Sequence, residues 1–152
     1  MISIREANIN DIDSIMEINL SSFSHPYNAE LFTKAIEEEI VTVLVAESDG
    51  QVVGYCEGMF LMMEMEIQSL AVKEEYRRHG VATMLMDTML ARMGHMGVKD
   101  VFLEVRRGNK AARELYKRNG FKTIDMRKNY YQKPVEDACI MHHKIENEGL
   151  PC

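Results

Sequence analysis

The chain has 152 residues, of which 46% are hydrophobic and 28% are charged, and its formal net charge at pH 7 is −6. A single domain with one sizeable core is the expected organisation at this length and composition. The negative charge argues against general nucleic-acid binding, although a local basic patch stands at Arg77, Arg78 and His79.

The N-terminal segment and the cysteines favour a cytoplasmic protein. Arg5 and Glu6 precede any long apolar run, which is unlike a secretory signal, and no apolar stretch reaches the length of a membrane span. Cys56, Cys139 and Cys152 form no CxxC pair, and a reducing compartment is the simpler setting for such an odd set. We therefore expect a cytoplasmic location.

Strand patterns recur through the first half of the chain. The predicted strands of this half are residues 2–5, 42–47, 52–62 and 64–72. Ser48-Asp49-Gly50-Gln51 is a hairpin turn signal, which predicts that the second and third of these strands are antiparallel neighbours.

Two helices are predicted between the first two strands. Asn10 and Asp11 place a cap-type residue and an acidic residue at the start of the first helix. Its apolar stripe consists of Ile12, Ile15, Met16 and Leu20. Pro26 interrupts the pattern, and Asn28 is the predicted cap of the second helix.

The second half continues with helices and strands in alternation. A helix begins after Gly80 and is predicted to end at Gly94 and Gly97, and a further helix over residues 109–119 has Asn109 as its cap and Gly120 just past its end. The predicted strands are residues 99–106, 122–126 and 138–144, with a Tyr-Tyr loop between the last two. The order βααβββαβαββ predicts an α/β sheet covered by helices on both faces.

A strand, a basic turn, a glycine and a helix follow one another between Leu70 and Met89. The first N–H groups of a helix have no partner within the helix, and the helix dipole places partial positive charge beside them. Glycine lets a ligand approach the backbone, and Arg77 and Arg78 add full charges. The lysine of a P-loop and the three glycines of a dinucleotide fingerprint are missing, but the element is suited to phosphate.

Glu104 lies inside the apolar run Val101-Phe102-Leu103-Glu104-Val105. A carboxylate buried in such a strand would be costly without a partner. The strand face that Phe102 and Glu104 share is therefore predicted to be either solvated or part of a site.

These motifs together resemble the GCN5-related N-acetyltransferases. Arg77-x-x-Gly80-x-Ala82 after a strand is similar to their pyrophosphate loop. The string LEVRxxNxxAxxLYxxxGF over residues 103–121, with Asn129-Tyr130-Tyr131 and Glu136-Asp137-Ala138, looks like the second half of the RimI-type protein N-alpha-acetyltransferases. The likeness covers roughly residues 66–145, whereas the N-terminal third matches only in element order and in a loose SFxxPY echo.

The resemblance implies a mixed, mostly antiparallel twisted sheet and a role for each matching residue. Acetyl-CoA would be bound by Leu70, Ala71, Val72, Arg77, Arg78, His79, Gly80, Val81, Ala82, Thr83 and Asn109. Glu104 would be the general base and Tyr116 the acid for the leaving thiolate. The peptide groove would be bordered by Phe23, Pro26, Tyr27, Tyr130 and Tyr131.

The same resemblance implies a single N-acetyltransferase domain over residues 1–152 that acts on protein or peptide N-termini beginning with Ser, Ala, Thr or Met. Ribosomal proteins are among the implied substrates, with no nucleic acid, membrane or metal, and the chain would be a monomer or weak homodimer. A lysine side chain or a small amine as acceptor stays open, as does a non-catalytic acetyl-CoA-binding module.

Two clusters keep alternative interpretations. Some archaeal relatives have histidine at the position of Glu66, so Glu66 is interpreted as a second base, as a charge that selects the amine, or as a solvated strand carboxylate. Cys139-x-x-His142-His143 contains metal-ligand residue types, but strand alternation would send the two histidines to opposite faces, and no metal site is expected there.

Overall fold

The computed structural model describes residues 1–23 and 29–146, and over these residues the elements follow the predicted order. The strands are β1 (Ile2–Glu6), β2 (Val41–Ser48), β3 (Gln51–Leu61), β4 (Glu64–Val72), β5 (Asp100–Arg106), β6 (Lys122–Tyr131) and β7 (Glu136–Lys144). The α-helices are α1 (Ile12–Ser22), α2 (Ala29–Glu37), α3 (Val81–His95) and α4 (Lys110–Arg118), and two short 3-10 helices are η1 (Ile9–Asp11) and η2 (Glu74–Tyr76).

One seven-stranded sheet runs through the molecule in the order β1-β2-β3-β4-β5-β7-β6. Neighbouring strands are antiparallel except β4 and β5, which are parallel because α3 carries the chain between them. The sheet is therefore mixed and mostly antiparallel, as the resemblance implied.

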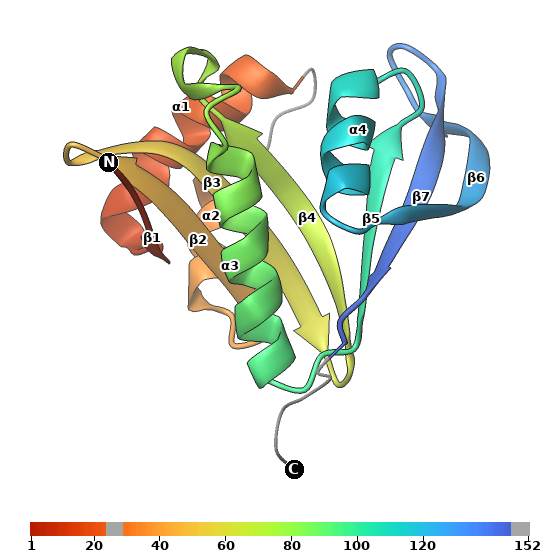
Figure 1. Cartoon of the computed structure of the whole chain (residues 1–152). Coiled ribbons are helices and arrows are strands. Elements are labelled where there is room, and N and C mark those ends of the chain that lie inside the picture. The colour runs from red at the N-terminus through yellow and green to blue at the C-terminus, as the bar shows by residue number, and fades with distance from the viewer. Residues whose placement is uncertain (24–28, 147–152) are drawn as a thin grey trace.

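Helices cover the two faces of this sheet unequally (Figure 1). On one face, α3 packs on β2, β3 and β4 while α4 lies over β5 and β7, and this layer holds the larger core, with Leu85, Met89 and Leu103 almost fully buried. On the other face, α1 and α2 cover β2, β3 and β4 through Ile15, Phe32 and other buried residues. The expected cover on both faces is thus complete only over β2, β3 and β4. On the face that carries α1 and α2, no helix of the described residues covers β5, β7 and β6, and this part is called the open face.

The turn and cap signals of the sequence are largely confirmed. Asp49 and Gly50 both have positive φ, as a tight hairpin turn requires, and Gly120 has positive φ after α4. The Asn109 side chain accepts a hydrogen bond from the Ala112 backbone N–H at the start of α4. These signals were readable because few residues other than glycine, asparagine and aspartate adopt positive φ, and because a short polar side chain can accept the hydrogen bond of a helix start.

Several boundaries differ from the prediction. Asn8 and Asp11 form a capping box on η1, so the capping begins upstream of Asn10. α3 ends at His95, between Gly94 and Gly97 as predicted, whereas Leu20 is 59% exposed instead of buried on the α1 stripe. The predicted cap Asn28 lies outside the described residues.

The Tyr-Tyr segment is the clearest correction. Tyr130 and Tyr131 were expected in a loop, but they end β6, which continues past the predicted boundary at Met126. Asn129 does adopt positive φ, and the register of β6 against β7 shifts between Arg127 and Tyr131. The segment expected as a loop is therefore part of β6, with an irregularity at Asn129.

β4 has one extra residue relative to β3, and it parts from β5 close to the same point. Glu57 of β3 pairs with Ser69 whereas Gly58 pairs with Ile67, which leaves Gln68 bulged. Pairing of β4 with β5 ends at Ile67 opposite Leu103, and beyond that point the strands diverge, as Figure 1 shows. The divergence opens the centre of the sheet.

Candidate functional site

A cleft of about 260 Å³ occupies the space where β4 and β5 diverge. It gathers residues that are far apart in the sequence, from α1, β4, β5, α4 and β6. The predicted site residues that line it are Phe23, Leu70, Glu104, Asn109, Tyr116 and Tyr131. The fold thus brings the predicted acid, the predicted base and part of the predicted coenzyme site together.

The start of α3 has the geometry of an anion site. Arg78 and Gly80 have φ of 64° and 79°, and this turn precedes the first helical N–H groups. Gly80 is the N-cap, no side chain caps the helix start, and a Cβ on Gly80 would meet nothing within 4 Å. Arg78 and His79 are exposed beside it. Open N–H groups, the helix dipole and the Arg78 guanidinium suit a pyrophosphate.

Arg77 has structural contacts of its own. Its Nε donates to the Val72 carbonyl oxygen at 3.0 Å, and its Nη2 lies 3.3 Å from the Ser22 hydroxyl. These bonds tie the end of β4 to α1. Arg77 therefore braces the turn that precedes α3, in addition to the coenzyme contact predicted for it.

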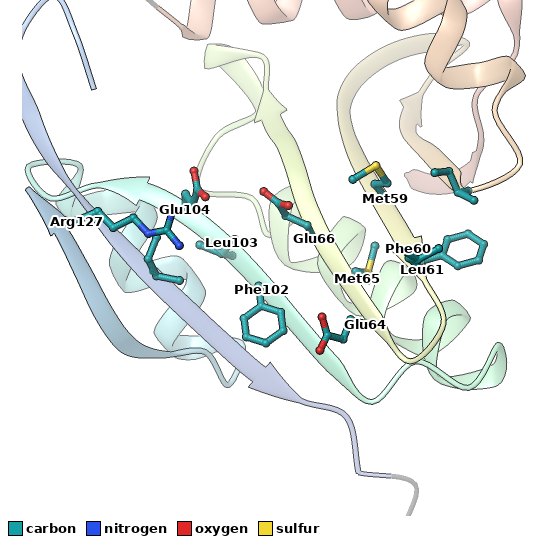
Figure 2. A pocket seen from close by; sticks show the side chains of 12 residues that line it. Met59, Phe60, Leu61, Glu64, Met65, Glu66, Phe102, Leu103, Glu104 and Arg127 are labelled. Carbon is teal, nitrogen blue, oxygen red and sulfur yellow. The ribbon is translucent and has the colours of Figure 1, made fainter. Parts of the chain in front are cut away.

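A second hollow, a groove of about 330 Å³, lies on the open face of the sheet (Figure 2). Glu66 of β4 and Glu104 of β5 both line it, because residues 66, 102 and 104 project from the same face. Burial raises the pKa of Glu66, and the Glu104 charge raises it further, while Arg127 opposes both effects. The two carboxylates therefore face the same groove and repel each other electrostatically.

Glu104 and Leu103 line both the cleft and the groove. The carboxylate that the sequence singled out thus lies where the two hollows meet. A group entering along the cleft and a group entering along the groove would come together at this residue.

Tyr116 is held by packing on the buried side of α4. Its ring makes an edge contact with Phe121 at 5.9 Å between centroids and packs on the larger core. Burial is the main cause that raises the pKa of its hydroxyl. The hydroxyl consequently keeps its proton at neutral pH and is available as a donor.

Of the aromatic residues expected to border the peptide groove, Phe23 and Tyr131 line the cleft and Tyr130 lies beside Glu104, and none of these three lines the groove on the open face. The rings of Tyr130 and Tyr131 are in edge contact at 5.1 Å, and the Arg106 guanidinium lies 4.4 Å from the Tyr131 ring centre. Hydrogen bonding to Glu104 raises the pKa of Tyr130, and burial raises that of Tyr131 to about 12. Pro26 and Tyr27 lie outside the described residues.

A buried polar chain that the sequence did not reveal runs beside the cleft. The Asn19 amide donates to the Tyr55 hydroxyl at 2.7 Å, and this hydroxyl lies 2.7 Å from the Ser69 hydroxyl. Asn19 and Ser69 also line the cleft, and Ser69 is next to the bulged Gln68. The chain links α1 to the strand segment where β4 leaves β5.

Glu57 was missed as well, although its signal was the same as that of Glu104, a lone carboxylate inside an apolar strand. It is only 5% exposed and stands opposite Ser69 on the face that Tyr55 occupies. Burial raises its pKa from 4.5 to about 7. Among the residues that the structure describes, no cation forms an ion pair with it.

This burial predicts a pH-dependent penalty on stability. The folded chain keeps the Glu57 proton up to about pH 7, whereas the unfolded chain loses it near pH 4.5, so stability falls as the pH rises through this window. Glu57→Gln should therefore be more stable than the wild type by about 2 kcal/mol at pH 8, with the gain shrinking toward pH 4.5. Urea denaturation at pH 5 and 8 measures this, with exposed Glu17→Gln as control. A gain that is equal at both pH values would contradict the assignment.

No metal centre is found in the described ranges, where no group of three His, Cys, Asp or Glu residues could hold an ion. Cys139 is buried, His142 bonds to Asp100 at 2.7 Å, and the His143 ring bonds to the Gly120 carbonyl. Within the same ranges, no helix has the length and apolar character that a membrane crossing requires.

The arrangement is suited to acyl transfer from a phosphate-bearing carrier. The α3 start can hold phosphate, the cleft can admit an extended arm, and the cleft and groove meet at a carboxylate with a protonated tyrosine nearby. These are the parts needed to bring an amine to an acyl group and to move its protons.

Comparisons with known proteins agree with this chemistry. The family model described as "Acetyltransferase (GNAT) family" matches residues 12–121. An N-alpha-acetyltransferase of Sulfurisphaera tokodaii is 35% identical over 151 residues, which cover 91% of this chain and 90% of the relative.

Two solved structures share the fold along nearly the whole chain. The ribosomal-protein-S18-alanine N-acetyltransferase of Escherichia coli superposes with a TM-score of 0.89 at 25% identity, covering all of both chains. Ard1 from Thermoplasma volcanium gives 0.88 at 32% identity, covering 95% of this chain and 98% of the other. The chain therefore belongs to the acetyltransferase (GNAT) family, and it is an N-acetyltransferase that uses acetyl-CoA.

Proposed function

We propose that this enzyme transfers the acetyl group of acetyl-CoA to the free α-amino group of protein N-termini beginning with Ser, Ala, Thr or Met. The observation that carries the proposal is the position of Glu104 at the junction of the cleft and the groove. The thioester would approach along the cleft and the peptide along the groove, so that the two reactants meet beside one carboxylate.

Acetyl-CoA would be held mainly by backbone. The turn from Arg78 to Thr83 would bind the pyrophosphate, and the main chain of residues 70–72 would contact the pantetheine arm. Asn109 lines the cleft at the start of α4, where its backbone and side chain are already fixed by the cap. The absence of a Cβ at Gly80 leaves room for a phosphate to approach the helix start.

Glu104 would act as general base, directly or through water, with Glu66 as a second carboxylate on the same face. An α-amino group has a pKa of ~8, so a base of modest strength can supply the neutral nucleophile near pH 7. The amine nitrogen attacks the thioester carbon, its proton passes to the base, and the carbon–sulfur bond breaks. No covalent enzyme intermediate is required.

Tyr116 would return a proton to the departing thiolate. Its hydroxyl remains protonated because burial raises its pKa, and the ring is fixed against Phe121. A thiol has a pKa of ~8.5, below the raised pKa of Tyr116, so the hydroxyl would first stabilise the forming thiolate by donating a hydrogen bond. Its proton would pass to the sulfur as the proton released by the amine restores the hydroxyl.

The aromatic border favours a peptide over a small amine. Tyr130 and Tyr131 lie beside Glu104, where the cleft meets the groove, and Phe23 lines the cleft. Tyrosines offer both apolar rings and hydroxyl groups to the first residues of an extended backbone. The name of the S. tokodaii relative specifies N-alpha-acetylation, and that of the E. coli relative specifies an alanine of ribosomal protein S18. Substrates of this kind and acetyl-CoA are both present in the cytoplasm, where we expect the reaction to occur.

Peptide acetylation with mapping of the acetyl group tests the proposal. Peptides that begin with Ser, Ala, Thr or Met and contain internal lysines should gain one acetyl group, located on the α-nitrogen by mass spectrometry. The same peptides with a blocked N-terminus should stay unmodified, because a lysine amine has a pKa of ~10.4 and a base of modest strength does not deprotonate it near pH 7. Efficient labelling of internal lysine or of a polyamine would replace this function by an acetyltransferase for side-chain or small-molecule amines.

A further inference from the structure

The groove on the open face extends well beyond the point where the amine would react. Its apolar lining runs from Ile140 and Phe102 on one side to Ile40, Met59 and Phe60 on the other. The lining continues onto the tip of the β3–β4 hairpin, where Leu61 is 68% exposed and Met62 84% exposed. Exposed apolar side chains that continue a groove are typical of a surface that binds another chain, and methionine adapts to varied partners.

Carboxylates mark both ends of this groove (Figure 2). Glu66 and Glu104 lie at the end next to the cleft, and Glu64 lies beyond the Phe102 ring toward the hairpin tip. Glu64 and Glu66 project from the same face of β4, because they are two residues apart on one strand, and this spacing separates their Cα atoms by about 7 Å.

Among the acidic side chains on this part of the sheet, Glu64 has no positively charged partner in the described residues. Arg127 lines the groove on the side of Glu104 and offsets part of the rise in the Glu66 pKa, so a positive charge already faces the end next to the cleft. Asp100, which pairs with Glu64 across β4 and β5, is already bonded to His142 and stands opposite Lys144. Glu64 forms no ion pair with any residue in the described ranges.

We propose that the groove binds the N-terminal segment of a polypeptide in extended form, with a basic side chain at its third residue facing Glu64. The inference rests on the proposed function, because it starts from an α-amino group held between Glu66 and Glu104. An extended chain also advances about 7 Å over two residues, so a peptide lying along β4 brings its third side chain to Glu64. The apolar lining between the two ends would contact the second residue and the backbone.

Three matched peptides test this assignment. They are identical eight-residue sequences beginning Ala-Ala-Arg, Ala-Ala-Gln and Ala-Ala-Glu, assayed at saturating acetyl-CoA. We expect kcat/KM for the Arg peptide to exceed that for the Gln peptide by about threefold to fivefold, with the Glu peptide lowest, as is usual for one solvent-accessible ion pair. The difference should fall below about twofold in 0.5 M NaCl.

Two enzyme variants and a peptide with its arginine moved test whether the preference comes from a contact with Glu64 or from attraction of basic peptides by the net negative charge of the protein. In Glu64→Gln the Arg/Gln ratio should drop to about one, whereas exposed Glu17→Gln on α1 should keep the wild-type ratio. Moving the arginine to the seventh residue should abolish the preference. An equal preference at the seventh residue, or a ratio that survives Glu64→Gln, would overturn the assignment.

The Gln peptide distinguishes failure of the basic subsite at Glu64 from failure of the proposed N-terminal acetylation. If the wild-type enzyme acetylates it at its N-terminus with no preference for arginine, the basic subsite is wrong and the N-terminal activity stands. If none of the three peptides is acetylated on the α-nitrogen, the proposed function itself fails.

Discussion

Replacement of Tyr116 by phenylalanine is expected to lower kcat by about 10²- to 10³-fold, because a positioned acid that protonates a leaving group contributes this order of rate. The substitution removes one oxygen and keeps the ring, so the contact with Phe121 and the packing against the larger core should persist. Thermal stability and acetyl-CoA affinity should therefore stay close to the wild-type values. Steady-state kinetics with an Ala-initiated peptide and calorimetric titration of acetyl-CoA measure the two quantities separately.

A matched tyrosine gives the control. Tyr76 in η2 packs against the same core but lines neither the cleft nor the groove, so Tyr76→Phe should keep the wild-type kcat. If Tyr116→Phe also keeps it, water or another group protonates the thiolate, and the role proposed for Tyr116 is wrong. A loss of kcat in both variants would point to a general effect of the core on activity.

The order of the elements followed from the sequence because local chemistry specified it. Asp49 and Gly50 specified a hairpin turn with positive φ, and Asn109 specified the start of α4. Strand lengths were less well predicted, because they depend on pairing partners. Tyr130 and Tyr131 extend β6 because β7 is available beside them, despite the irregularity at Asn129.

Site residues could be predicted where a charged residue interrupts an apolar strand pattern. Glu104 could be singled out because a carboxylate in an apolar strand needs a reason, and Glu57 carried the same conflict without being recognised. The bulge at Gln68 had no such signal in β4, which has no glycine or proline there, and Gly58 stands at the register shift only on the partner strand β3. The divergence of β4 from β5, and therefore the cleft, depends on this long-range pairing.

The hydrogen-bonded chain of Asn19, Tyr55 and Ser69 also lay beyond sequence reasoning. Its members come from α1, β3 and β4, and only the packing of α1 on the sheet joins them. In the sequence, Asn19 follows a helical stripe and Tyr55 lies in a strand, and neither residue conflicts with its own element. Buried polar contacts between distant elements leave no local pattern to detect.

Gly80→Val is expected to weaken acetyl-CoA binding by about 100-fold or more, since blocking two charge-assisted hydrogen bonds to phosphate costs ~1.5–3 kcal/mol each. The new side chain would project into open space at the start of α3, where the phosphate is proposed to lie, and the φ of 79° would strain a β-branched residue.

Gly50 in the β2–β3 turn is a matched control, because its φ is 78° and a Cβ there also meets nothing within 4 Å. Gly50→Val should therefore carry a similar cost in stability, about 1–2 kcal/mol, and keep its affinity for acetyl-CoA. Titration calorimetry and urea denaturation of both variants separate backbone strain from loss of the ligand contact. Wild-type affinity in Gly80→Val, or an equal loss in Gly50→Val, would show that the α3 start is not the phosphate site.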